Sequence, residues 1–153
     1  TLELSSAASD VYKRQGSGGP AEAISVCSQE AAGIAEIVGR EQGVSIGRTA
    51  LKLRNANNRP PGWAKPLLSD DATEPQFVAV GADKFGAVLP IKLQKKCLTC
   101  HGPTDSIAAD VQARLTALYP DDQATGFREG DLRGWFWVEV PADAPQKPAG
   151  AAN

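Results

Sequence analysis

Apolar residues in the first part of the chain recur at the spacing of a helix that buries one face. Successive apolar positions are three or four residues apart, namely Ile24, Cys27, Ala31, Ile34 and Val38. Because an α-helix repeats about every 3.6 residues, this spacing predicts an amphipathic helix over residues 21–40. Gly43 follows Gln42 and favours the end of that helix. Cys27 lies in the middle of the predicted apolar stripe.

Alternating apolar and polar positions further along predict strands. We expect strands over residues 44–54, 77–80, 87–93 and 132–140, the third at a sheet edge because Pro90 lacks a backbone N–H. A helical turn is expected over residues 63–68, and a second helix from residues 103–105 to Tyr119-Pro120. The apolar face of that helix would consist of Ile107, Val111, Leu115 and Leu118. Strands joined mostly by turns predict an antiparallel sheet with helices packed on it, an α+β fold.

Composition separates one domain from the two ends of the chain. At 153 residues the chain is long enough for a single core. Residues 16–20 have a flexible linker composition, and residues 10–15 resemble a translated sequencing adaptor. We therefore expect residues 1–20 to be a disordered linker or an artefact, residues 21–140 to form the domain, and residues 141–153 to be a flexible tail.

The charge balance excludes some classes of partner. Sixteen basic and eighteen acidic residues give a net charge of −2, whereas a nucleic-acid-binding protein would be expected to carry a basic face. No apolar run approaches the ~20 residues of a membrane-spanning helix, so we expect no membrane span in this chain. The sequence does not indicate an oligomeric state.

The motif with the clearest chemistry is Cys97-Leu98-Thr99-Cys100-His101. Two cysteines separated by two residues and followed by histidine form the attachment pattern of c-type haem. Each thiol adds to one vinyl group of the porphyrin, and the following imidazole ligates the iron. The motif therefore predicts one covalent haem c, with Cys97 and Cys100 as thioethers and His101 as the proximal ligand.

Two other interpretations of the same motif stay open. Zinc uses thiolate and imidazole ligands, although it would need a fourth ligand and the adjacent Cys100 and His101 are awkwardly placed to share one tetrahedral ion. A redox-active dithiol is the second alternative, but it would follow a strand in a βαβ pattern that the sequence does not show.

Elimination suggests a ligand for the other face of the iron. The chain has one histidine and no methionine, so the two usual partners of a proximal histidine are missing. The third cysteine, Cys27, is the remaining soft ligand, and we predict that its thiolate is the distal iron ligand. The alternative is that Cys27 is a small buried apolar residue, with water, Lys or Tyr at the sixth position or nothing there.

Haem propionates need cationic or hydrogen-bonding partners. Candidates near the predicted strands are Arg48, Lys52, Arg54, Asn55 and Arg133. An ordinary solvated strand face is the competing interpretation for each of them. Trp63, Trp135 and Trp137 are candidates for the pocket wall or, more commonly for such residues, for the core.

Four stretches in one order resemble a known family. They are Gly47 to Asn55, Cys97 to Gly102, Tyr119-Pro120-Asp121-Asp122 and Gly130 to Gly134. Together they resemble a c-type haem domain family first catalogued as a domain of unknown function. The resemblance covers residues 21–140 and implies a PAS-like fold, an antiparallel sheet flanked by helices. It also implies an exported haem protein or extracytoplasmic sensor module, with a cysteine of the first helix, here Cys27, as axial ligand.

These observations lead to three functional hypotheses. The first is a redox or diatomic-gas sensor with iron ligated by His101 and Cys27. The second is a periplasmic cytochrome that transfers one electron to a partner protein, and the third is a zinc-stapled binding module. We expect no enzymatic activity, because two axial ligands leave no open position on the iron. Since haem c is attached outside the cytoplasm, we expect a periplasmic or otherwise exported protein whose signal peptide is absent from the sequence shown.

Overall fold

The computed structural model describes residues 19–144, except for the side chains of residues 26, 27, 29–32 and 34. Most of the predicted linker (1–20) and of the predicted tail (141–153) therefore lies outside the described residues. The helices and strands in chain order are α2 (Gly19–Gln42), β1 (Ser45–Thr49), β2 (Gln76–Val80), β3 (Lys84–Lys92), α3 (Leu98–His101), α4 (Ala109–Leu118) and β4 (Leu132–Pro141). Single 3-10 turns cover Lys65–Leu67, Lys95–Cys97 and Thr104–Ser106.

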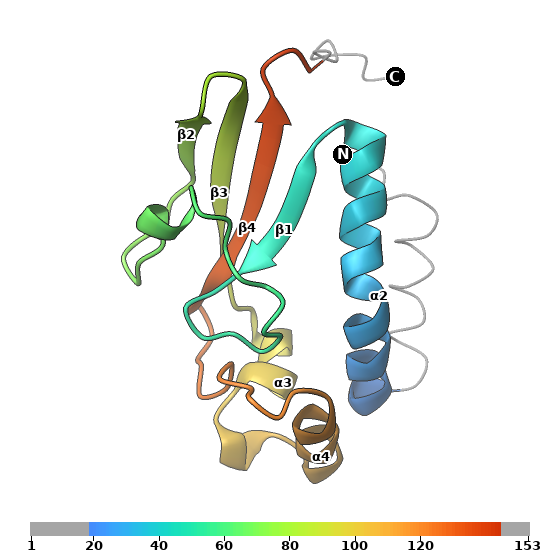
Figure 1. Cartoon of the computed structure of the whole chain (residues 1–153). Helices are drawn as coiled ribbons and strands as arrows, with labels where there is room; N and C mark the ends of the chain where they lie inside the picture. Colours follow the sequence, from blue (N-terminus) through green and yellow to red (C-terminus); the bar gives the residue numbers. More distant parts are fainter. Residues whose placement is uncertain (1–18, 145–153) are drawn as a thin grey trace, which may run out of the picture.

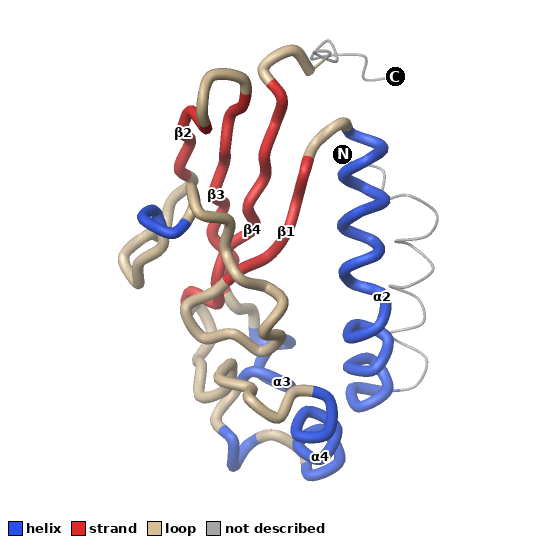
Figure 2. Tube along the Cα trace, in the orientation of Figure 1, coloured by secondary structure: helices blue, strands red, loops and turns tan. Residues whose placement is uncertain are grey.

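The four strands form one antiparallel sheet in the order β1-β4-β3-β2. Helix α2 runs alongside β1, while α3 and α4 gather at one end of the sheet (Figure 1). Figure 2 shows that a long loop between β1 and β2 crosses in front of the strands. The prediction of an α+β fold with an antiparallel sheet and helices packed on it is confirmed. None of the described helices is long and apolar enough to cross a membrane.

The first helix ends where its glycine predicted. Gly43 has a φ of 68°, a left-handed conformation that glycine adopts without steric cost. The N–H groups of Gly43 and Val44 donate to Arg40 O and Gly39 O at 3.3 and 2.9 Å, so two of the last four carbonyls of α2 are satisfied. The chain then turns directly into β1.

The strand predicted over residues 44–54 is too long. β1 stops at Thr49, which pairs with Trp135, and residues 50–54 form bends instead. Leu53 O accepts a hydrogen bond from Gln123 N at 2.9 Å, and the Arg54 side chain bonds to the segment around Cys100. These long-range contacts draw the chain out of the sheet, and sequence alternation carries no information about them.

The edge position predicted from Pro90 is also wrong, because β3 lies between β4 and β2. Pairing of β3 with β2 stops at Val88, opposite Gln76, two residues before the proline. On the other side Pro90 lies opposite Trp135 of β4. The proline is therefore placed where β3 has already run past the end of β2, so its missing N–H costs no bond in that pairing.

The second predicted helix begins later than expected. A 3-10 turn covers Thr104–Ser106, Ile107 and Ala108 are extended, and α4 begins at Ala109. The predicted apolar face is nevertheless present, since Ile107, Val111 and Leu115 are buried together with Ile24 of α2. Leu118 packs against this cluster, which joins α4 to α2.

Two further core clusters fix the sheet and the cysteine motif. Val88 and Trp135 pack with Ala64, and Trp63 packs beside them, so these two tryptophans belong to the core. Leu93, Ala124 and Phe127 form the other cluster, against which Cys97 and Leu98 pack. This last cluster holds the cysteine motif against the loop that precedes β4.

Candidate functional site

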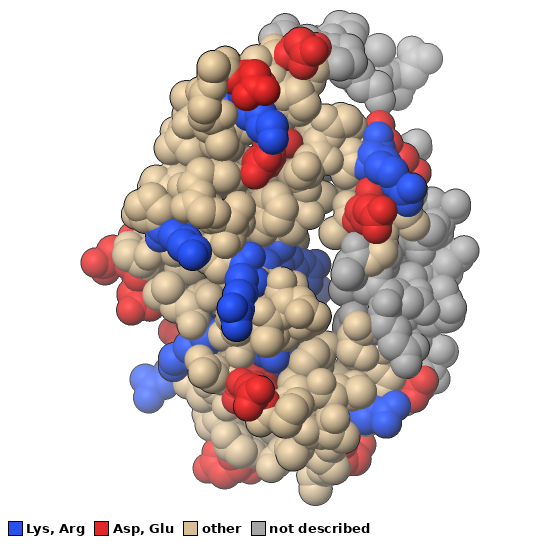
Figure 3. All heavy atoms as spheres, viewed as in Figure 1, with Lys and Arg blue, Asp and Glu red and all other residues tan. Residues whose placement is uncertain are grey.

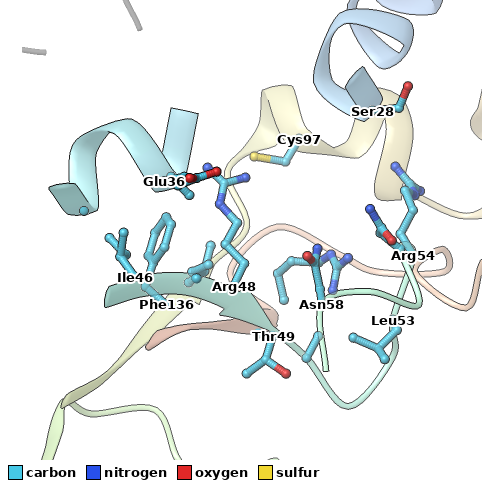
Figure 4. A pocket seen from close by; sticks show the side chains of 18 of the residues that line it. Ser28, Glu36, Ile46, Arg48, Thr49, Leu53, Arg54, Asn58, Cys97 and Phe136 are labelled. Carbon is cyan, nitrogen blue, oxygen red and sulfur yellow. The ribbon is translucent and has the colours of Figure 1, made fainter. Parts of the chain in front are cut away.

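A cavity of about 1230 Å³ lies between α2, β1 and the cysteine motif. Its wall includes Cys97, Cys100 and His101 from the motif, and Arg48, Leu53 and Phe136 are seen with Cys97 in Figure 4. Figure 3 shows the molecule hollowed between α2 and the rest of the domain, with Lys and Arg side chains beside the hollow. The volume exceeds the range of about 300–1,000 Å³ that holds drug-sized ligands, so the cavity has room for a larger ligand.

The cysteine motif is itself helical, which the sequence analysis did not predict. The 3-10 turn Lys95–Cys97 continues into α3, Leu98–His101. Residues three apart in a helix lie on one side, so Cys97 and Cys100 both reach the cavity wall. Both cysteines are half-buried, at the wall of the cavity.

His101 is held as a neutral imidazole with one nitrogen already engaged. Its Nδ1 lies 2.7 Å from Ala124 O, and a carbonyl can only accept, so Nδ1 carries the proton and donates. Burial, and secondarily the Arg54 guanidinium, lower the pKa of His101 to about 4. Nε2 is therefore the unprotonated nitrogen at neutral pH, the form that ligates a metal. Phe127 packs edge-on against the ring at 6.4 Å between centroids.

Arg54 ties three separate parts of the chain together beside His101. Its Nε donates to Asp122 Oδ2 at 2.9 Å, and its Nη2 donates to Cys100 O at 2.5 Å and to Ala124 O at 3.1 Å. The Arg54 and Asp122 side chains are only 12% and 11% exposed. A buried cation of this kind is stable only with such partners, so the pair is a structural element of the site.

The other predicted anion-binding residues surround the cavity unevenly. Arg48, Asn55 and Arg133 line it, whereas Lys52 is exposed and outside the cavity wall, with its Nζ 5.2 Å from the Phe127 centroid. The Arg48 guanidinium lies 4.9 Å from the Phe136 centroid. Burial, and then the nearby Arg54 charge, lower the pKa of Arg133 to about 10, so it stays cationic at neutral pH. Together with Arg54 these arginines make the cavity wall electropositive.

A protein-family model matches most of the chain. The model of the Tll0287-like family matches residues 2–141. The chain belongs to the Tll0287-like family. The match begins inside the segment set aside as a linker or an artefact, and it confirms the resemblance inferred from the sequence motifs.

One solved structure is similar in fold over nearly the whole chain. It is the crystal structure of the cyanobacterial haem protein Tll0287, which is 24% identical and aligns with a TM-score of 0.60. The alignment covers 92% of this chain and 93% of that chain. A search of curated proteins gave no significant match.

The donor groups of the site are those that a c-type haem would use. Among the residues whose side chains are described, no three His, Cys, Asp or Glu come close enough to hold a metal ion. A haem needs only one protein nitrogen below the iron and two thiols at its edge, and the cavity of this Tll0287-like domain offers His101, Cys97 and Cys100. Cys27 belongs to α2, but its side chain lies outside the described part of the structure.

Three residues of the site were missed by the sequence analysis. Asp122 was named only within a stretch that carries the family resemblance, yet it binds both Arg54 and, through Oδ1, the Ala124 N–H at 2.8 Å. Ala124 acts through its backbone carbonyl, for which side-chain identity gives no signal. Phe127 is 26 residues from the motif, and only the loop geometry brings it to His101. The acidic pair Asp121-Asp122 was the one available hint.

Proposed function

We propose that this domain carries one covalent haem c and acts as a redox or diatomic-gas sensor whose iron is ligated by His101 and Cys27. The observation that carries the proposal is one cavity wall formed by two thiols and a neutral imidazole whose Nδ1 is already bonded. Bound haem would supply one-electron redox chemistry and binding of diatomic gases. The membership in the Tll0287-like family and the fold shared with a cyanobacterial haem protein support this assignment.

Each residue of the wall has a distinct task in the proposal. Cys97 and Cys100 provide the two thioether bonds, and His101 Nε2 is the proximal ligand. Ala124 O fixes the tautomer and the orientation of that imidazole, as outer-shell carbonyls do for metal-bound histidines. Arg48 and Arg133 supply positive charge to the cavity and are the strongest partners for haem propionates.

Helical periodicity supports Cys27 as the distal ligand. Position 27 comes four residues after Ala23 and three after Ile24, which both line the cavity, and later cavity-lining positions of α2 include Ala35. Residues at these spacings share one helix face, so position 27 belongs to the face that α2 turns toward the cavity. A bond from Cys27 would tie α2 to the haem, and both axial positions would be filled, which disfavours catalysis at the iron.

The way in which α2 is attached supports the sensing role. It packs on the rest of the domain through Ile24 against α4, through Arg114 Nε donating to Ser25 Oγ at 2.6 Å, and through β1. Loss of an axial bond would remove an attachment of this helix to the domain, and its packing would then change. We further propose that the sheet and its helices form a PAS-like module that functions in the periplasm or another exported location.

Covalent haem attachment is the first prediction. The full chain produced with a c-type haem maturation system should keep its Soret band with the polypeptide through acid-acetone extraction, at about one haem per chain. The double variant Cys97→Ala/Cys100→Ala should lose this extraction-resistant band. Thr99→Ala, inside the same motif, is the matched control and should keep it. A wild-type chain that holds zinc and shows no Soret band would overturn the haem assignment in favour of the zinc-stapled module.

Thiolate ligation is the second prediction. Cys27→Ser should change the ferric absorption and electron paramagnetic resonance spectra from low-spin His/thiolate to a form with a weaker sixth ligand, because serine is a far poorer iron ligand than thiolate. Ser28→Ala, one position along and also at the cavity, should leave the spectra unchanged. An unchanged low-spin spectrum in Cys27→Ser would remove the thiolate from the proposal.

Carbon monoxide separates the sensor from the alternative electron-transfer cytochrome. A sensor should bind CO rapidly after dithionite reduction, and small-angle X-ray scattering should then report a change in compactness as α2 loosens. A ferrous form that excludes CO and exchanges electrons quickly with a partner protein would instead support one-electron transfer.

A further inference from the structure

The backbone of Ala124 makes hydrogen bonds with three side chains. Asp122 Oδ1 accepts from its N–H at 2.8 Å, while its carbonyl accepts from His101 Nδ1 at 2.7 Å and from Arg54 Nη2 at 3.1 Å. Arg54 and Asp122 also bind each other at 2.9 Å. Ala124 itself is fully buried, so water does not compete for these groups. The carbonyl that orients the imidazole is therefore set by a closed ring of contacts.

We propose that Arg54 is a positioning residue for His101, acting through the shared carbonyl of Ala124, and is not a propionate partner. This inference rests on the proposed haem site. The donor contacts of Arg54 point at Asp122, Cys100 O and Ala124 O, so its Nε and Nη2 are both engaged within the protein. By holding Cys100 O as well, the same guanidinium fixes the helical turn that carries both the second thiol and the imidazole.

Sharing the carbonyl has a chemical consequence for the imidazole. A carbonyl that already accepts from a cation is a weaker acceptor for a second donor, so the bond from His101 Nδ1–H has less imidazolate character. A less basic imidazole donates less charge to a ferric iron, and the positive charge of Arg54 acts in the same direction. Arg54 should therefore raise the reduction potential while keeping the imidazole in one orientation.

The test compares two arginines of the same cavity. Arg54→Gln and Arg48→Gln each remove one positive charge, but Arg48 contacts the Phe136 ring and does not contact Ala124. Both haem-loaded full chains would be labelled with 15N-histidine, which reports on the chain's one histidine alone. In the reduced state, solvent exchange of the His101 Nδ1–H proton should be at least about tenfold faster in Arg54→Gln, because a charge-assisted contact that closes the site is lost. It should be unchanged in Arg48→Gln.

Reduction potentials complete the experiment. Both variants should have lower potentials than wild type, since each loses a cation, and Arg54→Gln should show the larger shift. Should Arg54→Gln fail to fold, Arg54→Lys keeps the charge without the fork that spans three acceptors, and should still show the faster exchange. Equal exchange rates in the Arg54 and Arg48 variants would overturn the positioning role. Absence of haem from the wild-type chain would instead refute the proposed function, so the two failures are distinguishable.

Discussion

Asp122→Ala is expected to lower the free energy of unfolding by about 3–4 kcal/mol, which is the usual cost of leaving one member of a buried ion pair without its partner. Arg54 would keep its charge in a site where its side chain is only 12% exposed. The Ala124 N–H would also lose its acceptor. Since small domains are stable by only about 5–15 kcal/mol, this is a large fraction of the total.

Urea unfolding followed by far-UV circular dichroism would measure this loss. The matched control is Glu36→Ala, because Glu36 pairs with Arg40 at 4.0 Å with both side chains 72% exposed. An exposed pair of this kind contributes at most about 0.5 kcal/mol, so the control should be nearly neutral. A loss below about 1 kcal/mol for Asp122→Ala would mean that Arg54 reaches solvent easily, contrary to its burial.

Gly134→Ala is expected to be similarly disruptive, by about 3 kcal/mol or more, from steric overlap added to backbone strain. Gly134 has a φ of 156°, and a Cβ added there would overlap Thr49 O and lie 2.8 Å from Ala50 Cβ. Both neighbours belong to the main chain or are attached directly to it, so neither can rotate away. The residue lies where the pairing of β3 and β4 shifts register, next to Arg133.

A glycine-to-alanine substitution in α2 should instead raise the free energy of unfolding. Gly33 lies within α2, and a Cβ added there would meet no atom of the described residues within 4 Å. Gly33→Ala should therefore stabilise the domain by about 0.5–1 kcal/mol through helix propensity. Thermal unfolding of the two variants and wild type under identical conditions would show the contrast. A Gly134→Ala domain as stable as wild type would contradict this prediction. It would mean that β4 can shift relative to its neighbouring strands at this position and make room for the added methyl group.

Much of the fold was predictable because it rests on local periodicity. The first helix follows from apolar positions three and four apart, and its end follows from Gly43. The last strand and the hairpin of β2 and β3 follow from alternation and turn residues. The errors fall where distant contacts override the local pattern, as at the end of β1 and at Pro90.

The sequence also indicated Cys97, Cys100 and His101, which the structure brings to one cavity wall, because their spacing is contained within five residues. The candidate arginines were found by charge alone, and charge could not separate their tasks. Arg48, Arg54 and Arg133 all line the cavity, but Arg54 is also bound to Asp122 and to two backbone carbonyls beside His101. That the Cys27 thiolate is the distal iron ligand stays a prediction, which the helical periodicity of α2 supports.

The sequence by itself indicated the candidate haem-binding motif and most of the helices and strands, because both are encoded by residues a few positions apart. Only the tertiary structure decided what surrounds His101. The acceptor of its Nδ1 proton is the backbone carbonyl of Ala124, 23 residues from His101, and Arg54, which shares this carbonyl, is 70 residues from Ala124. Such partners are chosen by how the loop folds over the motif, and a carbonyl is the same in every residue type.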